Sequence, residues 1–368
     1  MTQRRVISAG PAPIGPYSPA IAAGGLIFVS GILASDASGR ISGDITAQTR
    51  RVLDRLGEVL AAADSDMAHA VTVHVYLRRG EDFAAMNAVY QTYWKAQPPS
   101  RTTVVADLLG PDTRIEVAAV AVPRGAPRAA VNPPGWAASP LPYSYCVRAG
   151  EVLFLAGLVA RDRATNQPVQ GTVRQQLDLI MANARDIVGA AGVSFDHVTS
   201  ARVYLADPAS FAEMNEGWRA HFPRAKPSRA TLIAGLMQAA YKIEVTLVAH
   251  GAQAEHLPAD PPNQNLSGVV KAGRMVFVSG MLAAGSGDAA AQTRATLAKA
   301  RAALARAGAS PRDVVDCTVW LPDLANFAAM NGAYREVFTE APPARATVGA
   351  GLAAKDALVE IAMTAMLP

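Results

Sequence analysis

Apolar and polar positions along the chain follow two periods, one typical of helices and one typical of strands. The segment 52–60 has the i, i+1, i+4, i+7, i+8 spacing of a single helical stripe. The β-branched segment AVTVHVYL (70–77) predicts a strand, and a second helix and two further strands are expected after it. The predicted class is α+β, a sheet with two helices on one face. The helical stripe consists of Val52, Leu53, Leu56, Val59 and Leu60.

The same pattern occurs three times. FAAMNAVYQTYW (83–94), FAEMNEGWRAHF (211–222) and FAAMNGAYREVF (327–338) align without gaps. Upstream of them, three strand-like segments end at equivalent glycines. Equivalent residues lie 128 and then 116 residues apart (215−87, 331−215). This repeat is too long for a solenoid unit and suits a small domain. These glycines are Gly31, Gly157 and Gly280.

One arginine and one glutamate recur at constant distances inside segments that otherwise predict strands. From asparagine to arginine the interval is 14 in each copy (101−87, 229−215, 345−331). From arginine to glutamate it is 15 (116−101, 244−229, 360−345). Chance does not produce three identical sets of intervals, so we infer a threefold duplication.

We therefore expect three domains, which we call copy 1 (1–123), copy 2 (136–250) and copy 3 (263–368). The segments 123–136 and 251–263 are rich in Pro, Ala and Gly and are predicted to be linkers. A small sheet with helices on one side needs cover on its other face. Three such sheets cover one another around a threefold axis, so the expected architecture is an intramolecular pseudo-trimer with the sheets inside and the helices outside.

Composition narrows the function classes. With 51% apolar and 17% charged residues, the chain has material for several cores and no long disordered tract. The net charge of +4 is the difference between 34 basic and 30 acidic residues, and the basic residues form only scattered pairs, which do not indicate a nucleic-acid groove. No apolar run is long enough for a membrane span, so we expect a cytoplasmic protein without a membrane partner. Cys146 and Cys317 are too few for a disulfide framework or a thiolate metal site, and we expect both to be buried.

The segments GPYSPAI…LIFVSG (15–31), FAAMNAVY (83–90) and PPSRTTVV…RIEVAAVA (98–121) resemble the RidA/YjgF family of reactive-intermediate deaminases. The resemblance extends over nearly the whole chain, three times. It implies three tandem chorismate-mutase-like domains with ligand pockets at their boundaries. It also implies hydrolysis of enamines and imines such as 2-aminoacrylate to 2-keto acids and ammonia, without a metal or organic cofactor.

The resemblance also implies roles for individual residues. It gives the arginines a carboxylate-binding role, the glutamates a water-positioning role and the other residues a place in the pocket wall. The implied catalytic residues are Arg101, Glu116, Arg229, Glu244, Arg345 and Glu360. The implied substrate-binding residues are Tyr17, Ser30, Gly31, Asn87, Thr103, Tyr143, Gly157, Asn215, Thr231, Ser279, Gly280, Asn331 and Thr347.

The three copies depart from the family pattern in different ways. Copy 3 has Leu266 in place of the tyrosine, and copy 2 has Ala156 in place of the serine. Threonine replaces a frequent cysteine in every copy, and apolar residues follow the three glycines. The pockets are therefore expected to be unequal and more apolar than in most members. The apolar residues are Ile32, Leu158 and Met281.

The chemistry of the arginine and glutamate suits an imine of a 2-keto acid. A guanidinium offers two parallel donors to the carboxylate beside the C=N carbon, and a carboxylate can accept a proton from attacking water. A hairpin that turns near Gly110 would place Glu116 about four residues, or roughly 13 Å, along from Arg101. The structural alternative is that arginine and glutamate form an ion pair across strands or between copies, and that the asparagines only cap or bridge backbone groups.

Three functions remain open from the sequence. The first is enamine/imine deamination. The second is a non-catalytic protein that binds small carboxylates, and the third is a specialised hydrolase or lyase of a larger aminomuconate- or chorismate-like acid. In each case the partner is a small carboxylate-bearing molecule, with further self-association of the chain left open. The histidines do not have metal-ligand spacing, so no metal is expected.

Overall fold

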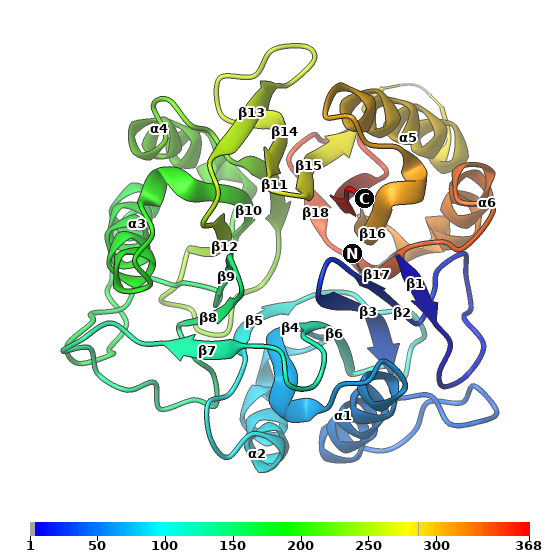
Figure 1. Ribbon diagram of the computed structural model, residues 1–368, viewed down its shortest axis with the longest axis horizontal. Coiled ribbons are helices and arrows are strands. Elements are labelled where there is room, and N and C mark those ends of the chain that lie inside the picture. The colour runs from blue at the N-terminus through cyan, green and yellow to red at the C-terminus, as the bar shows by residue number, and fades with distance from the viewer. Residues whose placement is uncertain (1–3, 286) are drawn as a thin grey trace.

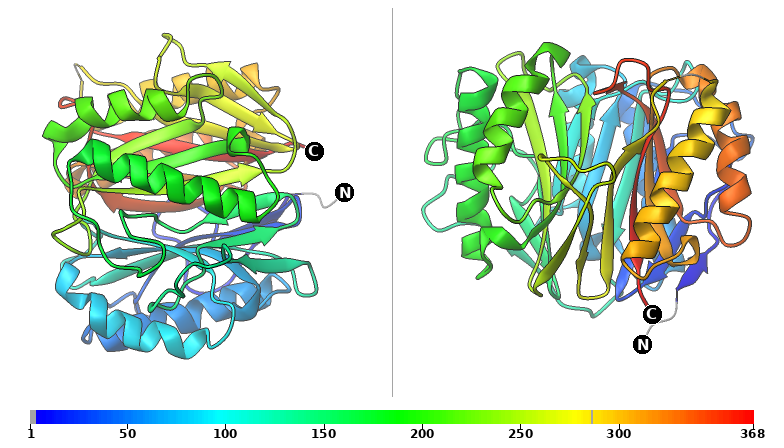
Figure 2. Two further views of the ribbon diagram at one scale, coloured as in Figure 1. Left: turned by 90° about the vertical axis from the view of Figure 1, so that its left-hand side faces the viewer. Right: turned by 90° about the horizontal axis from the view of Figure 1, so that it is seen from above.

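The computed structural model of the protein describes residues 4–285 and 287–368. Within these residues the chain forms three mixed sheets, each accompanied by two α-helices. The sheets lie around a common centre and the helices lie on the outside (Figure 1). The side views in Figure 2 show the same layering, with α-helices covering the outer faces of the strands. The predicted α+β class with three sheet-and-helix units is confirmed.

The first sheet is built from copy 1. Its strand order is β1-β2-β3-β6-β4-β5, and β4 pairs with β5 in parallel and with β6 antiparallel. The strand predicted at 70–77 is β4, with those bounds. The strands are β1 (Arg5–Ile7), β2 (Ala20–Ala23), β3 (Leu26–Leu33), β4 (Ala70–Leu77), β5 (Ser100–Val105) and β6 (Ile115–Ala121), and the helices are α1 (Ile45–Ala62) and α2 (Phe83–Tyr93).

The second sheet has the order β18-β11-β10-β12-β9-β8-β7. Its outermost strand, β18, comes from copy 3 and pairs with β11, so this edge joins two copies. The strands are β7 (Arg128–Val131), β8 (Cys146–Ala149), β9 (Val152–Leu155), β10 (Val198–Leu205), β11 (Ser228–Ile233), β12 (Ile243–His250) and β18 (Gly351–Leu352), and the helices are α3 (Val173–Ala190) and α4 (Phe211–His221).

The third sheet has the order β13-β14-β15-β19-β16-β17, which repeats the order of the first. The strands are β13 (Ala254–Pro258), β14 (Ser267–Ala272), β15 (Met275–Leu282), β16 (Val314–Leu321), β17 (Ala344–Gly349) and β19 (Glu360–Met366), and the helices are α5 (Ala289–Arg306) and α6 (Phe327–Val337). Short 3₁₀ turns lie at Met67–His69, Gly80–Asp82, Phe195–His197, Pro208–Ser210, Pro311–Asp313 and Leu324–Asn326.

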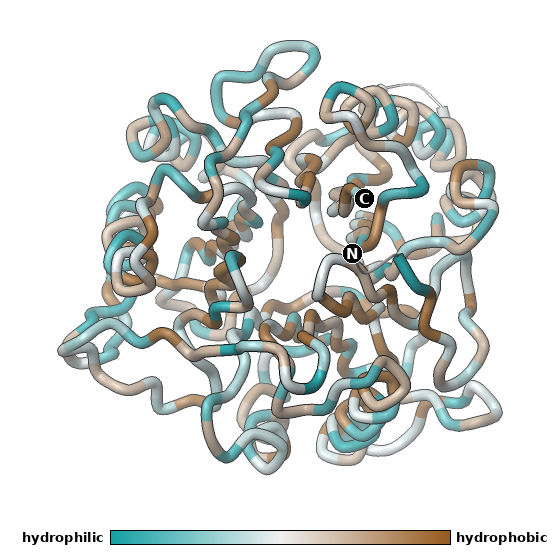
Figure 3. Tube along the Cα trace, viewed as in Figure 1, coloured by the Kyte–Doolittle hydropathy of each residue, from teal (hydrophilic) through white to brown (hydrophobic). Residues whose placement is uncertain are grey.

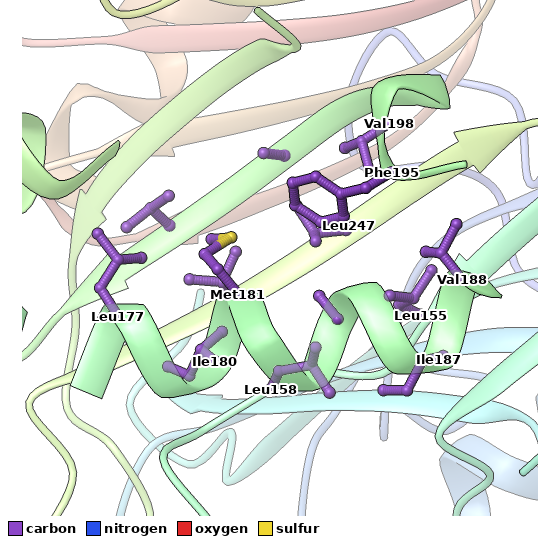
Figure 4. Packing of buried hydrophobic residues seen from close by; sticks show 14 of the residues in the cluster. Leu155, Leu158, Leu177, Ile180, Met181, Ile187, Val188, Phe195, Val198 and Leu247 are labelled. Carbon is purple, nitrogen blue, oxygen red and sulfur yellow. The ribbon is translucent and has the colours of Figure 1, made fainter. Parts of the chain in front are cut away.

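The long helices begin at side chains that cap them. Asp44 and Asp288 each accept the backbone N–H three residues on, and Thr172 forms a capping box with Gln175. The stripe predicted at 52–60 is buried against the first sheet. Figure 4 shows the equivalent core of copy 2, where Leu177 and Met181 of α3 project onto strand residues. Hydrophobic segments accordingly concentrate on the strands, and hydrophilic ones on the periphery (Figure 3).

The two segments predicted to be linkers contain strands. β7 lies within 123–136 and pairs with β8, and β13 lies within 251–263 and pairs with β14. Each segment thereby adds an edge strand to the following sheet, as β1 does in copy 1. The Pro- and Gly-rich composition did not predict these short strands. They form because pairing with an existing sheet edge compensates for their weak intrinsic strand preference.

The hairpin expected near Gly110 does not form. β6 pairs with β3 and β4, while β5 lies at the sheet edge on the far side of β4. Arg101 on β5 and Glu116 on β6 are therefore separated by a whole strand. Consecutive strands often pair, but here the crossover makes β5 parallel to β4, and β6 inserts between β3 and β4.

The sheets meet in two buried seams formed by residues of all three copies. The described residues around the centre also enclose a polar cavity of about 80 Å³. Equivalent positions there differ between copies: His74, Arg202 and Thr318 share one level, and Arg202 donates to Thr318 Oγ1 at 2.7 Å. Three arginines at this level would repel one another, so divergence between copies allows a buried charge close to the centre.

Candidate active site

The three arginines lie on the equivalent strands β5, β11 and β17, and the three glutamates lie on the central strands β6, β12 and β19. Every one of these side chains is buried, with 2–5% of each residue exposed. The charge that acts on each glutamate comes from the arginine of a different copy. We call the resulting pockets 3/1 (Arg345 with Glu116), 1/2 (Arg101 with Glu244) and 2/3 (Arg229 with Glu360). The sequence paired arginine with glutamate within one copy, and this geometry is wrong because β4 separates them.

The recurrence of a glycine beside the glutamate has a steric origin in each copy. A Cβ atom placed on Gly31, Gly157 or Gly280 would lie 1.9 Å from Oε1 of the glutamate in the same copy. Real Cβ atoms do not approach an oxygen that closely, so only glycine lets the carboxylate lie against the backbone. The glycine thereby fixes the position of the carboxylate in each pocket.

Burial raises the pKa of Glu116, Glu244 and Glu360 to about 8. Two weaker influences lower it: the backbone N–H of the threonine across the boundary, and the arginine of that same copy. A carboxyl group with such a pKa exists in both protonation states near neutral pH. It can therefore accept a proton from water and also return one.

The arginines are not ion-paired with these glutamates. Among residues 4–285 and 287–368, no carboxylate oxygen lies within 4.0 Å of Arg101, Arg229 or Arg345. The ion-pair alternative therefore does not describe this arrangement. Several guanidinium nitrogens are buried without a hydrogen-bond partner in the described part of the chain: Arg101 Nη1, Arg229 Nε, Arg345 Nε and Arg345 Nη1. Unfilled donors of a buried guanidinium suit a carboxylate ligand.

Helix side chains orient two of the three guanidiniums. Asn215 Oδ1 accepts from Arg229 Nη2 at 2.6 Å, and Asn331 Oδ1 accepts from Arg345 Nη2 at 2.7 Å. The Asn331 and Asn215 amides thus do more than bridge backbone groups. In copy 1, by contrast, Asn87 Nδ2 donates to the Phe83 carbonyl at 2.9 Å.

Aromatic rings hold Arg101 in place of an asparagine. Its guanidinium carbon lies 4.7 Å from the ring centre of Tyr90 and 5.8 Å from that of Tyr143, which belongs to copy 2. In pocket 3/1 the ring of Tyr17 lies 5.3 Å from Arg345. Pocket 2/3 has Leu266 in its wall at the equivalent position, so its arginine has no tyrosine from the neighbouring copy over it.

Three equivalent threonine hydroxyls are also unsatisfied. Thr103, Thr231 and Thr347 are buried, and their Oγ1 atoms find no partner within the described residues. Each threonine also presents its backbone N–H to the glutamate across the boundary. Each pocket therefore combines a free hydroxyl, free guanidinium donors and a carboxylate, which together can hold a small polar molecule.

The two serines join the copies. Ser30 Oγ accepts the Arg345 backbone N–H at 2.8 Å and donates to the Ser18 carbonyl. Ser279 Oγ likewise accepts the Arg229 backbone N–H and donates to the Ser267 carbonyl. Pocket 1/2 has Ala156 there, and its boundary is held by the Gly157 N–H, which donates to the Arg101 carbonyl at 3.0 Å.

The cavities differ in size. Pocket 1/2 encloses about 50 Å³ and pocket 2/3 about 410 Å³. A cavity of about 310 Å³ adjoins Tyr17, Ser30 and Gly31 in pocket 3/1. Ile32 and Met281 contribute to the walls of the two larger cavities, as the sequence suggested, while Leu158 is buried without lining a described one.

Sequence reasoning missed three cations in these walls: Arg55, Arg161 and Lys299. The available signal was their alignment, because Arg55 and Lys299 each lie 11 residues after the capping aspartate (55−44, 299−288). No cluster of three or more potential metal-ligating side chains occurs in the part of the chain that the structure describes. Cys146 and Cys317 are free thiols and are buried, as predicted, and burial raises the pKa of each to about 12. Of the described helices, none is long and apolar enough to cross a bilayer.

Comparisons with known proteins agree with the threefold pattern. The sequence model of the family described as "Endoribonuclease L-PSP" matches residues 7–123, 137–251 and 258–367. A RutC family protein of Pyrococcus horikoshii is 42% identical over 113 residues, which is 30% of this chain and 90% of that protein. The 3-aminoacrylate deaminase RutC of Acinetobacter baylyi is 38% identical over 113 residues, again 30% of this chain and 90% of that protein. The crystal structure of the YjgF gene product from E. coli is 32% identical, covers 33% of this chain and 99% of that one, and has a TM-score of 0.31.

Proposed function

The chain belongs to the family described as Endoribonuclease L-PSP, which includes RutC and YjgF proteins, and on this basis we propose that it hydrolyses enamine and imine derivatives of 2-keto acids to keto acid and ammonia. One relative is named a 3-aminoacrylate deaminase, which supports this reaction class. The observation that carries the proposal is the arrangement of each pocket: a buried guanidinium with unfilled donors lies opposite a buried carboxyl with a pKa of about 8.

In the proposed mechanism the arginine binds the substrate carboxylate with its free donors, which holds the adjacent C=N carbon in the pocket. The glutamate accepts a proton from water while the water oxygen forms a bond to that carbon. It returns this proton to the nitrogen, which gives a carbinolamine. The glutamate then takes the proton of the carbinolamine hydroxyl and passes it to the nitrogen, the C–N bond breaks as the C=O bond forms, and ammonia leaves. An enamine first accepts a proton on carbon to give the imine. One water is consumed and no electrons are transferred, so the reaction needs no redox partner.

The threonine hydroxyl and the backbone of the glycine would complete the pocket. Thr103, Thr231 and Thr347 each offer an unsatisfied hydroxyl on the arginine side of the boundary. We assign them to orientation of water or of the leaving nitrogen. Each pocket uses residues of two copies, so the chain is proposed to work as a single-chain pseudo-trimer, in which the peptide linkages keep the pocket partners together at any concentration.

The test uses a coupled assay. A pyridoxal-phosphate dehydratase releases 2-aminoacrylate, and the formation of pyruvate is timed with and without the protein. We expect acceleration above buffer, and its loss in the variant Arg101→Met, Arg229→Met, Arg345→Met, because the substrate carboxylate then lacks its partner. Arg50→Met is the matched control, since Arg50 is exposed and lines none of the three pockets.

Two results would overturn the proposal. One is the absence of acceleration by the folded protein, and the other is full acceleration by the triple variant. A 2-keto acid that raises the melting temperature while no imine is turned over would favour the non-catalytic binding protein instead. Because the family description names a ribonuclease, labelled RNA should be incubated in parallel, and we expect it to remain intact.

A further inference from the structure

Pockets 1/2 and 2/3 each carry a second cation beyond the arginine that faces the glutamate, and a third such cation lines the cavity next to pocket 3/1. Arg161 lines the same cavity as Arg101 and Glu244, and Lys299 lines the same cavity as Arg229 and Glu360. In pocket 3/1, Arg55 lines the cavity that adjoins Tyr17, Ser30 and Gly31. We propose that these three cations bind a second anionic group, so that the preferred substrates are imines and enamines of dicarboxylic 2-keto acids.

The second cations arise from two different places in the sequence. Arg55 of α1 and Lys299 of α5 occupy the same helical position, whereas copy 2 has Asn183 there. Copy 2 instead has Arg161, which lies four residues after its glycine (161−157), where copy 1 has Ser35 (35−31). Ser35 Oγ accepts from Arg55 Nη1 at 3.3 Å, so the two sequence positions lie side by side. Positive charge is therefore retained in or next to every pocket although the residue that supplies it differs.

These cations have capacity for a ligand. Within residues 4–285 and 287–368, none of them has a carboxylate oxygen within 4.0 Å. Arg55 Nε is buried without a partner. Arg161 is positioned by the Asn166 carbonyl, which its Nη1 meets at 2.6 Å, and by the ring of Tyr241 at 5.5 Å. Lys299 Nζ donates to the Leu282 carbonyl at 3.0 Å and retains two further donors.

The chemistry of the pocket decides which end of the substrate each cation takes. The glutamate must reach the C=N carbon, so the arginine opposite it takes the carboxylate attached to that carbon. A distal carboxylate then extends past the glycine toward the second cation. Pocket 2/3, with about 410 Å³, has room for such an extension, and in pocket 3/1 the extension would enter the adjoining cavity of about 310 Å³ past Gly31. Pocket 1/2, with about 50 Å³, suits the shortest diacids. This inference rests on the proposed function for its reaction, but its binding component can be measured separately.

The kinetic test compares imines that differ only in the second carboxylate. Amino-acid oxidases generate 2-iminobutanoate and 2-iminoglutarate in the assay, and keto-acid release is followed for both. We expect kcat/KM to be about 10- to 150-fold higher for the diacid, the range of a hydrogen bond to a charged group. The variant Arg55→Met, Arg161→Met, Lys299→Met should lose this preference, because its KM for the diacid should rise far more than its KM for the monoacid.

Conservative and matched variants separate charge from structure. Arg55→Lys with Lys299→Arg keeps the charges and should keep the preference. Arg301→Met, an exposed change on α5 outside the pocket wall, should not alter it. An equal kcat/KM for the two imines in the natural protein, or an unchanged preference in the Met variant, would refute the second site.

Calorimetry with the keto acids themselves distinguishes failure of this inference from failure of the proposed reaction. If neither imine is hydrolysed faster than in buffer, the reaction is wrong, and binding of 2-oxobutanoate and 2-oxoglutarate still decides the second site. Tighter binding of 2-oxoglutarate that is lost in the Met variant supports it. Equal binding of the two keto acids contradicts it.

Discussion

Pockets 1/2 and 2/3 share the same arginine, glutamate and glycine, which we call the reactive frame, and differ in the residues that surround these three. Both place a guanidinium opposite a glutamate that lies on a glycine. Pocket 1/2 closes around Arg101 with the rings of Tyr90 and Tyr143 and leaves about 50 Å³. Pocket 2/3 orients Arg229 through Asn215, has Leu266 in its wall and leaves about 410 Å³.

This difference shows what duplication in one chain permits. In an assembly of identical chains every substitution enters all pockets at once, whereas here each pocket can change alone. The groups that contact the reacting atoms in the proposed mechanism are kept in all three, and the walls that select the substrate have diverged. The following predictions test whether that division is real.

The largest effect is expected from removing all three glutamates, which gives the baseline for variants that keep only one of them. Replacing Glu116, Glu244 and Glu360 together by Gln should lower kcat by about 10²–10⁴ because the proton acceptor is lost. With only Glu360 retained, turnover of five-carbon imines should persist. With only Glu244 retained, it should fall to the level of the triple variant while 2-aminoacrylate is still hydrolysed, as timed keto-acid release will show. Equal selectivity of the two single-pocket proteins would mean that the cavity walls do not select substrates.

A methyl group on the glycine should disable a pocket without removing any of its charged groups. In Gly280→Ala the new Cβ would overlap Glu360 Oε1, so the carboxylate must move. We expect the activity of pocket 2/3 to fall about tenfold or more and the free energy of unfolding to fall by about 1–3 kcal/mol, measured by urea denaturation. Gly157→Ala should do the same in pocket 1/2, where the Cβ also comes within 3.2 Å of the Thr102 backbone. Gly332→Ala, which has open space around it, is the control.

The pH dependence should be common to all pockets. Since the carboxyl pKa is about 8 in each, kcat/KM should rise with pH and level off above about 8 in every single-pocket protein. Different midpoints would show that the divergence of the walls reaches the reactive frame.

Stability should change with pH in the opposite direction. The folded pKa of about 8 lies above the ordinary value of 4.5, so the folded state binds more protons between these limits. The free energy of unfolding should therefore fall as pH rises from 4.5 to about 8. Replacing the three glutamates by Gln should flatten this slope and stabilise the protein at pH 8, by on the order of 1 kcal/mol or more. A slope that survives these substitutions would assign it to other groups.

The smallest effect is expected at the serine that joins copies 2 and 3. Ser279→Ala leaves the buried Arg229 N–H without its acceptor, at a cost of about 1 kcal/mol in the free energy of unfolding. Pocket 1/2 already has Ala156 there, so Ala156→Gly serves as a comparison at a site without that bond. A loss of activity far greater than the loss of stability would indicate that the Ser279 hydroxyl contacts substrate.

Local pattern was sufficient for the elements and for the identity of the recurring residues. The helical stripe and the β4 strand follow from periodicity, because burial of one face imposes a period of 3.6 or 2 on the sequence. The fixed intervals identified asparagine, arginine and glutamate as positions retained together, and alignment of the upstream strands added the glycine. The short strands β7 and β13 escaped notice, because their pairing partners rather than their composition stabilise them.

Only the tertiary structure decided which residues meet. Insertion of β6 between β3 and β4 separates Arg101 from Glu116, and packing of the sheets brings Glu116 to Arg345 instead. Arg55, Arg161 and Lys299 likewise became neighbours of the pockets only through folding. The physical reason is that the period of apolar residues in a segment indicates only which of its faces is buried. Which strand or copy covers that face depends on the free energy of the whole fold, which no short segment specifies.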